Sequence, residues 1–107
     1  MKSVLITGCS SGIGLCIAKG LKEKGYRVFA SARTSDDVKN LQILGFESLF
    51  LDLASSESIN DAVIKLFEMT DNLYALINNG AYGQAGALED ISRDTLDKQF
   101  QSNVFGW

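Results

Sequence analysis

Short apolar runs alternate with segments of helical periodicity along the whole chain. Four apolar runs predict short buried strands, at residues 3–7, 27–32, 48–51 and 73–77. Apolar residues three or four apart predict a helix after each strand, at residues 13–24, at 36–44, after a capping Ser55 or Ser56, and after a capping Ser92. Gly25 and Gly45 stand where the first two helices are expected to end.

Three of these helices carry an apolar stripe that predicts a buried face. The stripes comprise Ile13, Cys16, Ile17 and Leu21 in the first helix, Ile59, Val63, Leu66 and Phe67 in the third, and Leu96, Phe100, Val104 and Trp107 in the fourth. The last stripe still continues at Trp107, with no signal that ends a helix. We therefore expect the sequence to be the first part of a longer fold.

Strands that alternate with helices imply parallel pairing through right-handed crossovers. Short apolar strands also fit a sheet that is covered on both faces. The sequence predicts an α/β fold, a Rossmann-like doubly wound parallel sheet that is incomplete, with about four strands in the order 3-2-1-4 and one domain over residues 1–107. The fourth strand and last helix would expose apolar side chains, so we expect self-association through them.

Composition narrows the possible functions. The 107 residues allow one core and no separate substrate domain. A net charge of −3 argues against a nucleic-acid partner, and no apolar run is long enough to span a membrane. The start is too briefly apolar for a signal peptide, so we expect a cytoplasmic protein. Histidine is absent, which excludes His-based triads and most zinc sites, and we predict no metal site.

The cysteines, Cys9 and Cys16, are too few for a disulfide framework. We expect Cys16 to pack as a small hydrophobe on the buried face of the first helix. Cys9 lies in a glycine-rich loop just before that helix, a position at which a thiol can become reactive.

The strongest functional feature is this loop, residues 7–14 with the sequence TGCSSGIG, between the first predicted strand and helix. Gly8 permits a tight turn, Gly12 lets the backbone approach a pyrophosphate, and Gly14 allows close packing of the helix on the strand. The helix presents free N–H groups and a partial positive charge to an anion. The predicted cofactor-binding residues of the loop are Gly8, Ser10, Ser11, Gly12, Ile13 and Gly14. A purely structural glycine turn is the alternative.

The loop differs from the generic G-x-G-x-x-G pattern, and its form Thr-Gly-x-x-x-Gly-Ile-Gly resembles the short-chain dehydrogenase/reductase family. Asp52, the segment NNGA at residues 78–81, and Asn103 in the segment NVFG also resemble family motifs in order and spacing. The resemblance implies that Asp52 contacts an adenine and that Asn103 holds a proton-relay water. It also implies cofactor contacts for Leu53, Asn79, Gly80 and Ala81.

Each of these matches has a simpler alternative. Asp52 can cap a helix or turn, Asn78 and Asn79 can form a turn, and Asn103 can be a hydrogen-bonded core amide. The family has Asn-Asn-Ala-Gly where this chain has Asn-Asn-Gly-Ala, which leaves the backbone path beside the cofactor open.

The residue after the second strand discriminates between NAD and NADP. An acidic side chain there would accept a hydrogen bond from the ribose 2′-hydroxyl, but Ala32 takes that position and Arg33 follows. A guanidinium can bind a 2′-phosphate through two parallel hydrogen bonds. The resemblance to the family likewise implies that an arginine at this position indicates NADP binding. Further hydroxyl donors are available from Ser10, Ser11 and Thr34. The nearby carboxylates of Asp36 and Asp37 would weaken the preference for NADP. We predict NADP(H) over NAD(H), with a solvated surface arginine as the alternative.

The resemblance implies hydride transfer between a nicotinamide and an alcohol or carbonyl substrate, with a catalytic Ser and a Tyr-x-x-x-Lys pair. Four residues after Tyr26, Tyr74 and Tyr82 stand Ala, Asn and Gly, so the pair is absent. We therefore predict the NADP(H)-binding half of a short-chain oxidoreductase, truncated before the catalytic Ser and Tyr-x-x-x-Lys and inactive alone. The alternatives are a non-catalytic dinucleotide-binding or interaction module and a nucleoside-binding methyltransferase, against which Ala32 argues.

Overall fold

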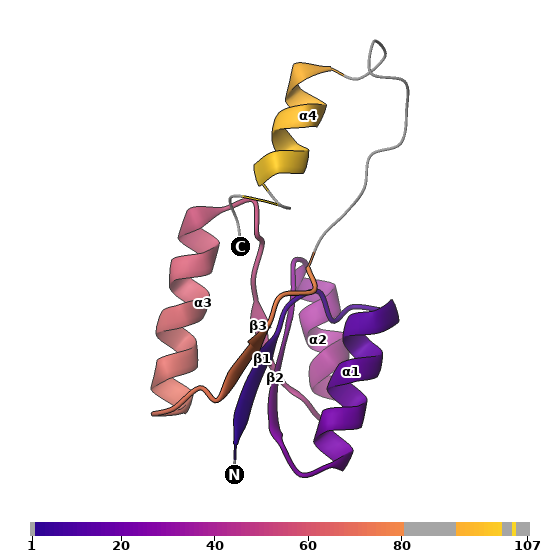
Figure 1. Cartoon of the computed structure of the whole chain (residues 1–107), viewed down its shortest axis with the longest axis vertical. Coiled ribbons are helices and arrows are strands. Elements are labelled where there is room, and N and C mark those ends of the chain that lie inside the picture. Colours follow the sequence, from indigo (N-terminus) through magenta and orange to yellow (C-terminus); the bar gives the residue numbers. More distant parts are fainter. Residues whose placement is uncertain (1, 81–91, 102–103, 105–107) are drawn as a thin grey trace.

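The computed structural model describes residues 2–80, 92–101 and 104 of the chain. Strands and helices alternate along it (Figure 1). The elements are β1 (Ser3–Ile6), α1 (Gly12–Glu23), β2 (Arg27–Ala32), α2 (Ser35–Ile43), β3 (Glu47–Phe50), α3 (Ser56–Met69), β4 (Ala75–Ile77) and α4 (Arg93–Phe100). Where the sequence predicted both bounds of an element, the observed bounds lie within two residues of them, and those of β2 are identical.

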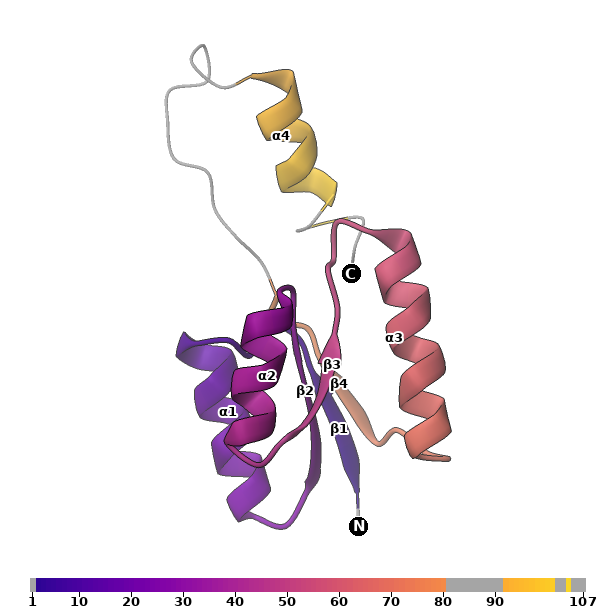
Figure 2. The same ribbon diagram turned by 180° about the vertical axis from the view of Figure 1, so that it is seen from behind.

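The strands form a parallel sheet in the order β3-β2-β1-β4, which confirms the predicted order. Helices α1 and α2 cover one face of this sheet and α3 covers the other, as the two opposite views show (Figures 1 and 2). Because parallel strands end at the same edge, the loops after β1, β2, β3 and β4 meet there.

The caps predicted at Ser55 and Ser92 and the helix ends predicted at Gly25 and Gly45 are confirmed, and Thr34 is a further cap that the sequence did not predict. Thr34, Ser55 and Ser92 cap α2, α3 and α4 by accepting hydrogen bonds from the N–H groups of Asp37, Ser58 and Thr95. Gly25 and Gly45 follow α1 and α2 with φ angles of 91° and 94°, a conformation that other residues rarely adopt.

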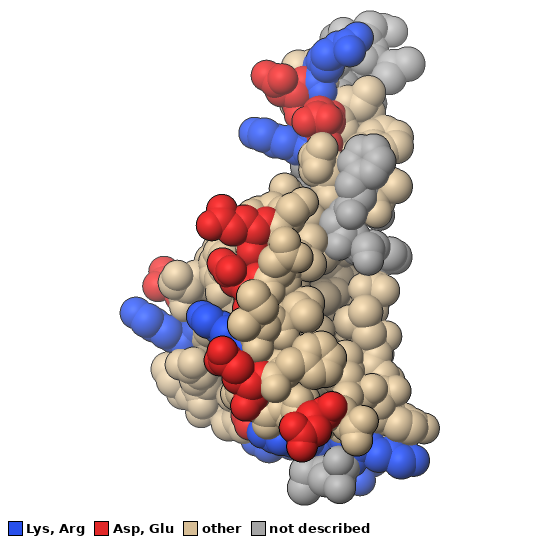
Figure 3. Space-filling model, turned by 90° about the vertical axis from the view of Figure 1, so that its left-hand side faces the viewer, with Lys and Arg blue, Asp and Glu red and all other residues tan. Residues whose placement is uncertain are grey.

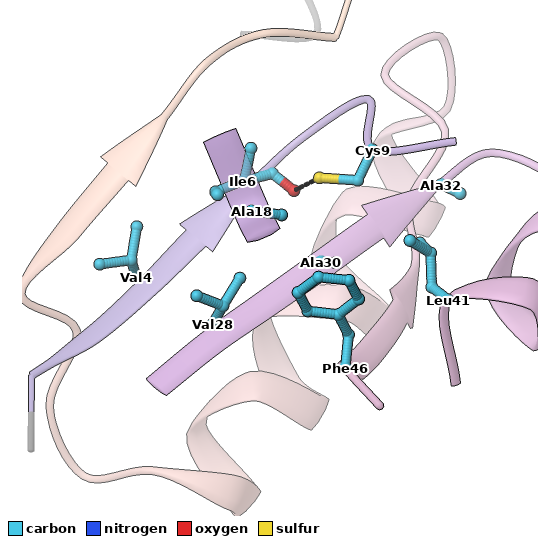
Figure 4. Packing of buried hydrophobic residues seen from close by; sticks show 9 residues of the cluster. All are labelled: Val4, Ile6, Cys9, Ala18, Val28, Ala30, Ala32, Leu41 and Phe46. Atoms are coloured by element: carbon cyan, nitrogen blue, oxygen red, sulfur yellow. Dashed lines mark hydrogen bonds between the residues drawn. The ribbon is translucent and has the colours of Figure 1, made fainter. Parts of the chain in front are cut away.

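Alternation along the strands divides the core between the two faces of the sheet. Figure 4 shows the larger cluster, on the side of α1 and α2. Its buried members are Val4, Ile6, Cys9, Ala18, Val28, Ala30, Ala32, Leu41 and Phe46. The smaller cluster lies under α3 and comprises Leu5, Phe29, Leu49 and Leu66.

The predicted buried face of α1 was partly wrong. Ile13 is 72% exposed and Cys16 is exposed, while Gly14 and Ala18 are buried. Gly14 turns inward because the start of α1 lies so close to the loop after β1 that a Cβ at position 14 would overlap the carbonyl oxygen of Gly8. Cys16 therefore has no packing role in the core.

The predicted buried face of α3 was also partly wrong, because the helix is rotated about its axis relative to the prediction. Leu66 is buried, but Val63 and Phe67 are exposed and Ser58 and Ala62 lie inward instead. Ser58 is turned toward the sheet because its hydroxyl accepts a hydrogen bond of 2.8 Å from the N–H of Asp52. A polar group thus fixes the rotation of this helix, and apolar spacing alone does not reveal it.

Helix α4 lies beyond the carboxyl edge of the sheet, apart from the other layers in both views (Figures 1 and 2). Its apolar residues Leu96 and Phe100 are exposed, as is Val104, and Trp107 lies outside the described residues. Among the helices described, none combines the length and the apolar character needed to cross a bilayer.

The rotation of α3 makes a testable distinction between neighbouring residues. Leu66→Ala opens a cavity in the core and should lower the free energy of unfolding by about 2–5 kcal/mol. Val63→Ala removes a side chain that is 42% exposed and should cost less than about 1 kcal/mol. Urea denaturation of both variants measures the difference. Equal losses would mean that the helix is rotated as the apolar stripe predicts.

Candidate dinucleotide-binding site

A pocket of about 290 Å³ lies at the carboxyl edge of the sheet. Every strand of the sheet contributes to it through its last residue or the loop that follows. The lining residues are Thr7, Gly8, Ser10 and Ser11 after β1, Ala32 and Arg33 at β2, Leu51, Asp52 and Leu53 after β3, and Asn79 and Gly80 after β4. Ligands of open parallel sheets bind at this edge.

Thr7 and Asn79 join the loops after β1 and β4 by a reciprocal set of hydrogen bonds. The buried Thr7 hydroxyl accepts from the backbone N–H groups of Asn79 at 3.0 Å and Gly80 at 2.8 Å. In return, the Asn79 side-chain amide donates to the carbonyl oxygens of Thr7 at 3.3 Å and Gly8 at 3.1 Å. The side chain of each loop thus bonds the backbone of the other loop, so the two loops are held together.

Glycines allow these loops to approach one another closely. Gly8 has a φ of 69°, and a Cβ on it would lie 2.8 Å from the Cα of Gly80. A Cβ on Gly80 would lie 2.8 Å from the Leu53 side chain and 3.2 Å from the Thr7 hydroxyl oxygen. A side chain at either position would force these loops apart.

The start of α1 is open to an anion. Ser11 is the N-cap residue, yet its hydroxyl makes no capping hydrogen bond, and the first turn of α1 contains no acidic residue. Gly12 has a φ of 63°, and a Cβ on it would meet no atom within 4 Å. The Ser11 hydroxyl and the first amides of the helix can therefore donate to a phosphate, with space left for its approach.

The end of β2 combines a small buried residue with a cation. Ala32 is 2% exposed, and the exposed Arg33 follows it in the pocket lining. Thr34, expected as a further donor, does not line the pocket; its hydroxyl caps α2 by accepting from the Asp37 N–H at 3.2 Å. The guanidinium is thus the cationic group of the pocket lining.

Asp52 forms the turn that its position suggested and also lines the pocket. One carboxylate oxygen accepts a hydrogen bond of 3.0 Å from the Ala54 N–H, which closes the turn before α3. The residue also lines the pocket beside Leu53. Turn formation and pocket lining are therefore compatible at this position.

Cys9 is not the reactive thiol that its position at a helix start made conceivable. The side chain is fully buried and donates to the Ile6 carbonyl oxygen at 3.3 Å. Burial raises the pKa of the Cys9 thiol to about 11, although a backbone hydrogen bond from Ser31 opposes this. The thiol is protonated at neutral pH and shielded from reagents.

The structure brings eight of the predicted site residues into one pocket: Gly8, Ser10, Ser11, Arg33, Asp52, Leu53, Asn79 and Gly80. Gly12, Ile13 and Gly14 begin α1 next to it, while Ala81 and Asn103 lie outside the described residues. The sequence interpretation did not count Thr7 and Leu51 as site residues. The place of Thr7 immediately before Gly8 in the glycine motif was the signal available for it.

A parallel α/β sheet whose first, glycine-rich loop lines a pocket at its carboxyl edge defines a nucleotide-binding domain of the Rossmann type. Residues 2–107 match the family model described as short chain dehydrogenase. The chain therefore belongs to the short-chain dehydrogenase family, whose members are oxidoreductases that use a nicotinamide cofactor and act on small molecules.

Individual relatives agree with this assignment. The uncharacterized oxidoreductase YbbO of Escherichia coli K12 is 47% identical over 106 residues, which are 98% of this chain and 39% of YbbO. A short-chain dehydrogenase from Streptomyces avermitilis superposes with a TM-score of 0.89 at 30% identity, over 98% of this chain and 40% of that one.

A solved short-chain dehydrogenase from Burkholderia cenocepacia, in complex with NADP, has a TM-score of 0.83 at 31% identity. The match covers 98% of this chain and 46% of that protein. The chain thus spans about two fifths of the length of the curated relatives that it matches.

The Thr7 hydroxyl can be tested by its removal. Thr7→Val removes the oxygen that accepts from the part-buried N–H of Asn79 and the buried N–H of Gly80, and loss of the acceptor of a buried donor costs about 1–3 kcal/mol. Urea denaturation should show a loss of about 2–4 kcal/mol, whereas Thr7→Ser keeps the oxygen and most of the stability. Thr70→Val, at the opposite edge of the sheet, is the control: the Thr70 hydroxyl donates to the exposed Asn72 carbonyl, accepts from the Asn72 N–H and bonds the Ser3 hydroxyl, but is the acceptor of no fully buried backbone N–H, so its removal should cost less. Equal losses at positions 7 and 70 would contradict the role of Thr7.

Proposed function

We propose that residues 1–107 form the NADP(H)-binding part of an oxidoreductase that transfers hydride between a nicotinamide and an alcohol or carbonyl substrate. The observation that carries the proposal is the pairing of Ala32 and Arg33 in the same pocket as the glycine-rich loop. A small residue leaves room for a 2′-phosphate, and a guanidinium offers it paired donors. The NADP complex of the Burkholderia cenocepacia relative supports the same cofactor.

The residues of the pocket fit the parts of this cofactor. The Ser10 and Ser11 hydroxyls and the open N-terminus of α1, at Gly12, Ile13 and Gly14, would hold the pyrophosphate. Asp52 and Leu53 would hold the adenine, and the segment at Asn79, Gly80 and Ala81 would lie along the nicotinamide half. The bound nicotinamide supplies or accepts the hydride.

Catalysis needs more than this binding surface. We propose that Asn103 holds a proton-relay water, as the resemblance to the family implies. The 107 residues contain no Tyr-x-x-x-Lys sequence. Without that pair, we expect these residues to bind the cofactor and not to complete hydride transfer on their own.

The cofactor preference is tested by titrating the chain with NADP⁺ and NAD⁺ in a calorimeter. Arg33→Ala should raise the Kd for NADP⁺ about 10- to 100-fold, because hydrogen bonds to a charged group contribute about 1.5–3 kcal/mol. The Kd for NAD⁺, which has no 2′-phosphate, should stay within about twofold. Arg93→Ala, at the start of α4 and outside the pocket, is the matched control.

The outcomes separate the parts of the proposal. Equal affinity of the parent chain for both cofactors would overturn the preference for NADP(H) and leave the family assignment standing. Binding of neither cofactor would overturn the assignment of the pocket.

We also propose that the chain self-associates through the edge of the sheet at β4 and the adjoining side of α3. Leu76 in β4 is 50% exposed, and Tyr74, Val63 and Phe67 are exposed as well. Figure 3 shows a largely uncharged surface beside the acidic side chains of α3, and the Lys2 ammonium lies 4.3 Å from the centroid of the Tyr74 ring. An apolar surface next to an unpaired strand edge favours pairing with a second copy.

Light scattering at micromolar concentration should therefore detect dimers or larger species. Leu76→Lys should shift the population toward the monomer, because it places a charge on the edge strand. Ile43→Lys changes a residue that is 82% exposed on α2, across the sheet from α3, and should have no such effect. A monomeric parent chain would rule this association out.

A further inference from the structure

The carbonyl oxygen of Ile6, the last residue of β1, accepts two side-chain hydrogen bonds. One comes from the Cys9 thiol at 3.3 Å, shown by the dashed line in Figure 4, and one from the Ser31 hydroxyl at 3.1 Å. The Cys9 backbone N–H also donates to the Ser31 carbonyl oxygen at 2.9 Å. All three residues are 0% exposed, so these bonds form without competition from water.

This cluster joins the glycine-rich loop to β2. Cys9 immediately precedes Ser10 and Ser11, which line the pocket at the phosphate side. Ser31 stands two residues before Arg33, which lines the pocket at the end of β2. The bonds among Ile6, Cys9 and Ser31 therefore fix the separation between the loop and the arginine.

We propose that Cys9 and Ser31 are positioning residues that determine the preference for a 2′-phosphorylated dinucleotide. This inference rests on the proposed function of the pocket. NADP(H) has to reach the loop with its pyrophosphate and Arg33 with its 2′-phosphate at the same time, so its affinity depends on the distance between them. NAD(H) has no 2′-phosphate and depends far less on that distance.

The chemistry of the two side chains suits a fixed link. The Cys9 thiol remains protonated at neutral pH and so keeps its role as donor to Ile6. A small apolar residue would fill much of the same volume without this bond. Packing and positioning can therefore be separated by substitution.

The test compares Ser31→Ala, Cys9→Ala and Cys9→Ser by calorimetric titration with NADP⁺ and with NAD⁺. Ser31→Ala and Cys9→Ala should each raise the Kd for NADP⁺ about three- to tenfold, as expected from the loss of one hydrogen bond. The Kd for NAD⁺ should change less than about twofold. Cys9→Ser keeps a donor at this position and should retain the affinity ratio of the parent chain.

Ser48→Ala is the matched control. The Ser48 hydroxyl, like that of Ser31, donates to a backbone carbonyl from a strand, but it bonds Phe46 at 3.2 Å and does not line the pocket. Its removal should leave the ratio of the two Kd values unchanged. The melting temperature of each variant shows whether it remains folded at the temperature of the titration.

The ratio of the two Kd values decides the result. A lowered preference for NADP⁺ in the two alanine variants, retained by Cys9→Ser, supports the inference. An unchanged ratio, or equal losses for both cofactors, overturns it and leaves the proposed function intact. If Ser31→Ala does not fold, the contrast between Cys9→Ala and Cys9→Ser carries the same decision. A parent chain that binds neither cofactor overturns the proposed function and this inference together.

Discussion

The exchange of hydrogen bonds between Thr7 and Asn79 is the constraint on which the pocket depends. It connects the loop after the central strand β1 with the loop after the edge strand β4, residues 72 apart in the sequence. Both loops also pack backbone against backbone at Gly8 and Gly80. Loops are the most mobile parts of such a fold. Without these bonds, the loops that line the pocket would not be held in fixed positions.

Much of the fold could be predicted because the signals are local. Apolar strands, capping residues and the glycines at 25 and 45 gave the element order, and the crossover rule then gave the strand order. The rotation of two helices could not be predicted, because it depends on contacts outside each helix that the spacing of apolar residues does not show. Ser58 lies inward through its bond to Asp52, and Gly14 through the close approach to Gly8.

The candidate site shows the same division. Gly8, Arg33 and Asp52 follow strand ends, and strand ends are visible in the sequence, so their convergence could be expected. Thr7 was overlooked because its contribution lies in bonds to Asn79 and Gly80, which only the folded chain brings near. The burial of Cys9 could not be predicted for a similar reason, since it depends on the packing of the loop against β2.

The contrast between the two cysteines has a practical consequence. Cys16 is exposed on α1, whereas Cys9, in the glycine-rich loop, is buried and its thiol has a raised pKa. A maleimide dye would therefore attach at one known position, on the helix whose N-terminus opens toward the pocket. The unaltered sequence thus carries a natural handle for fluorescence studies of the domain in solution.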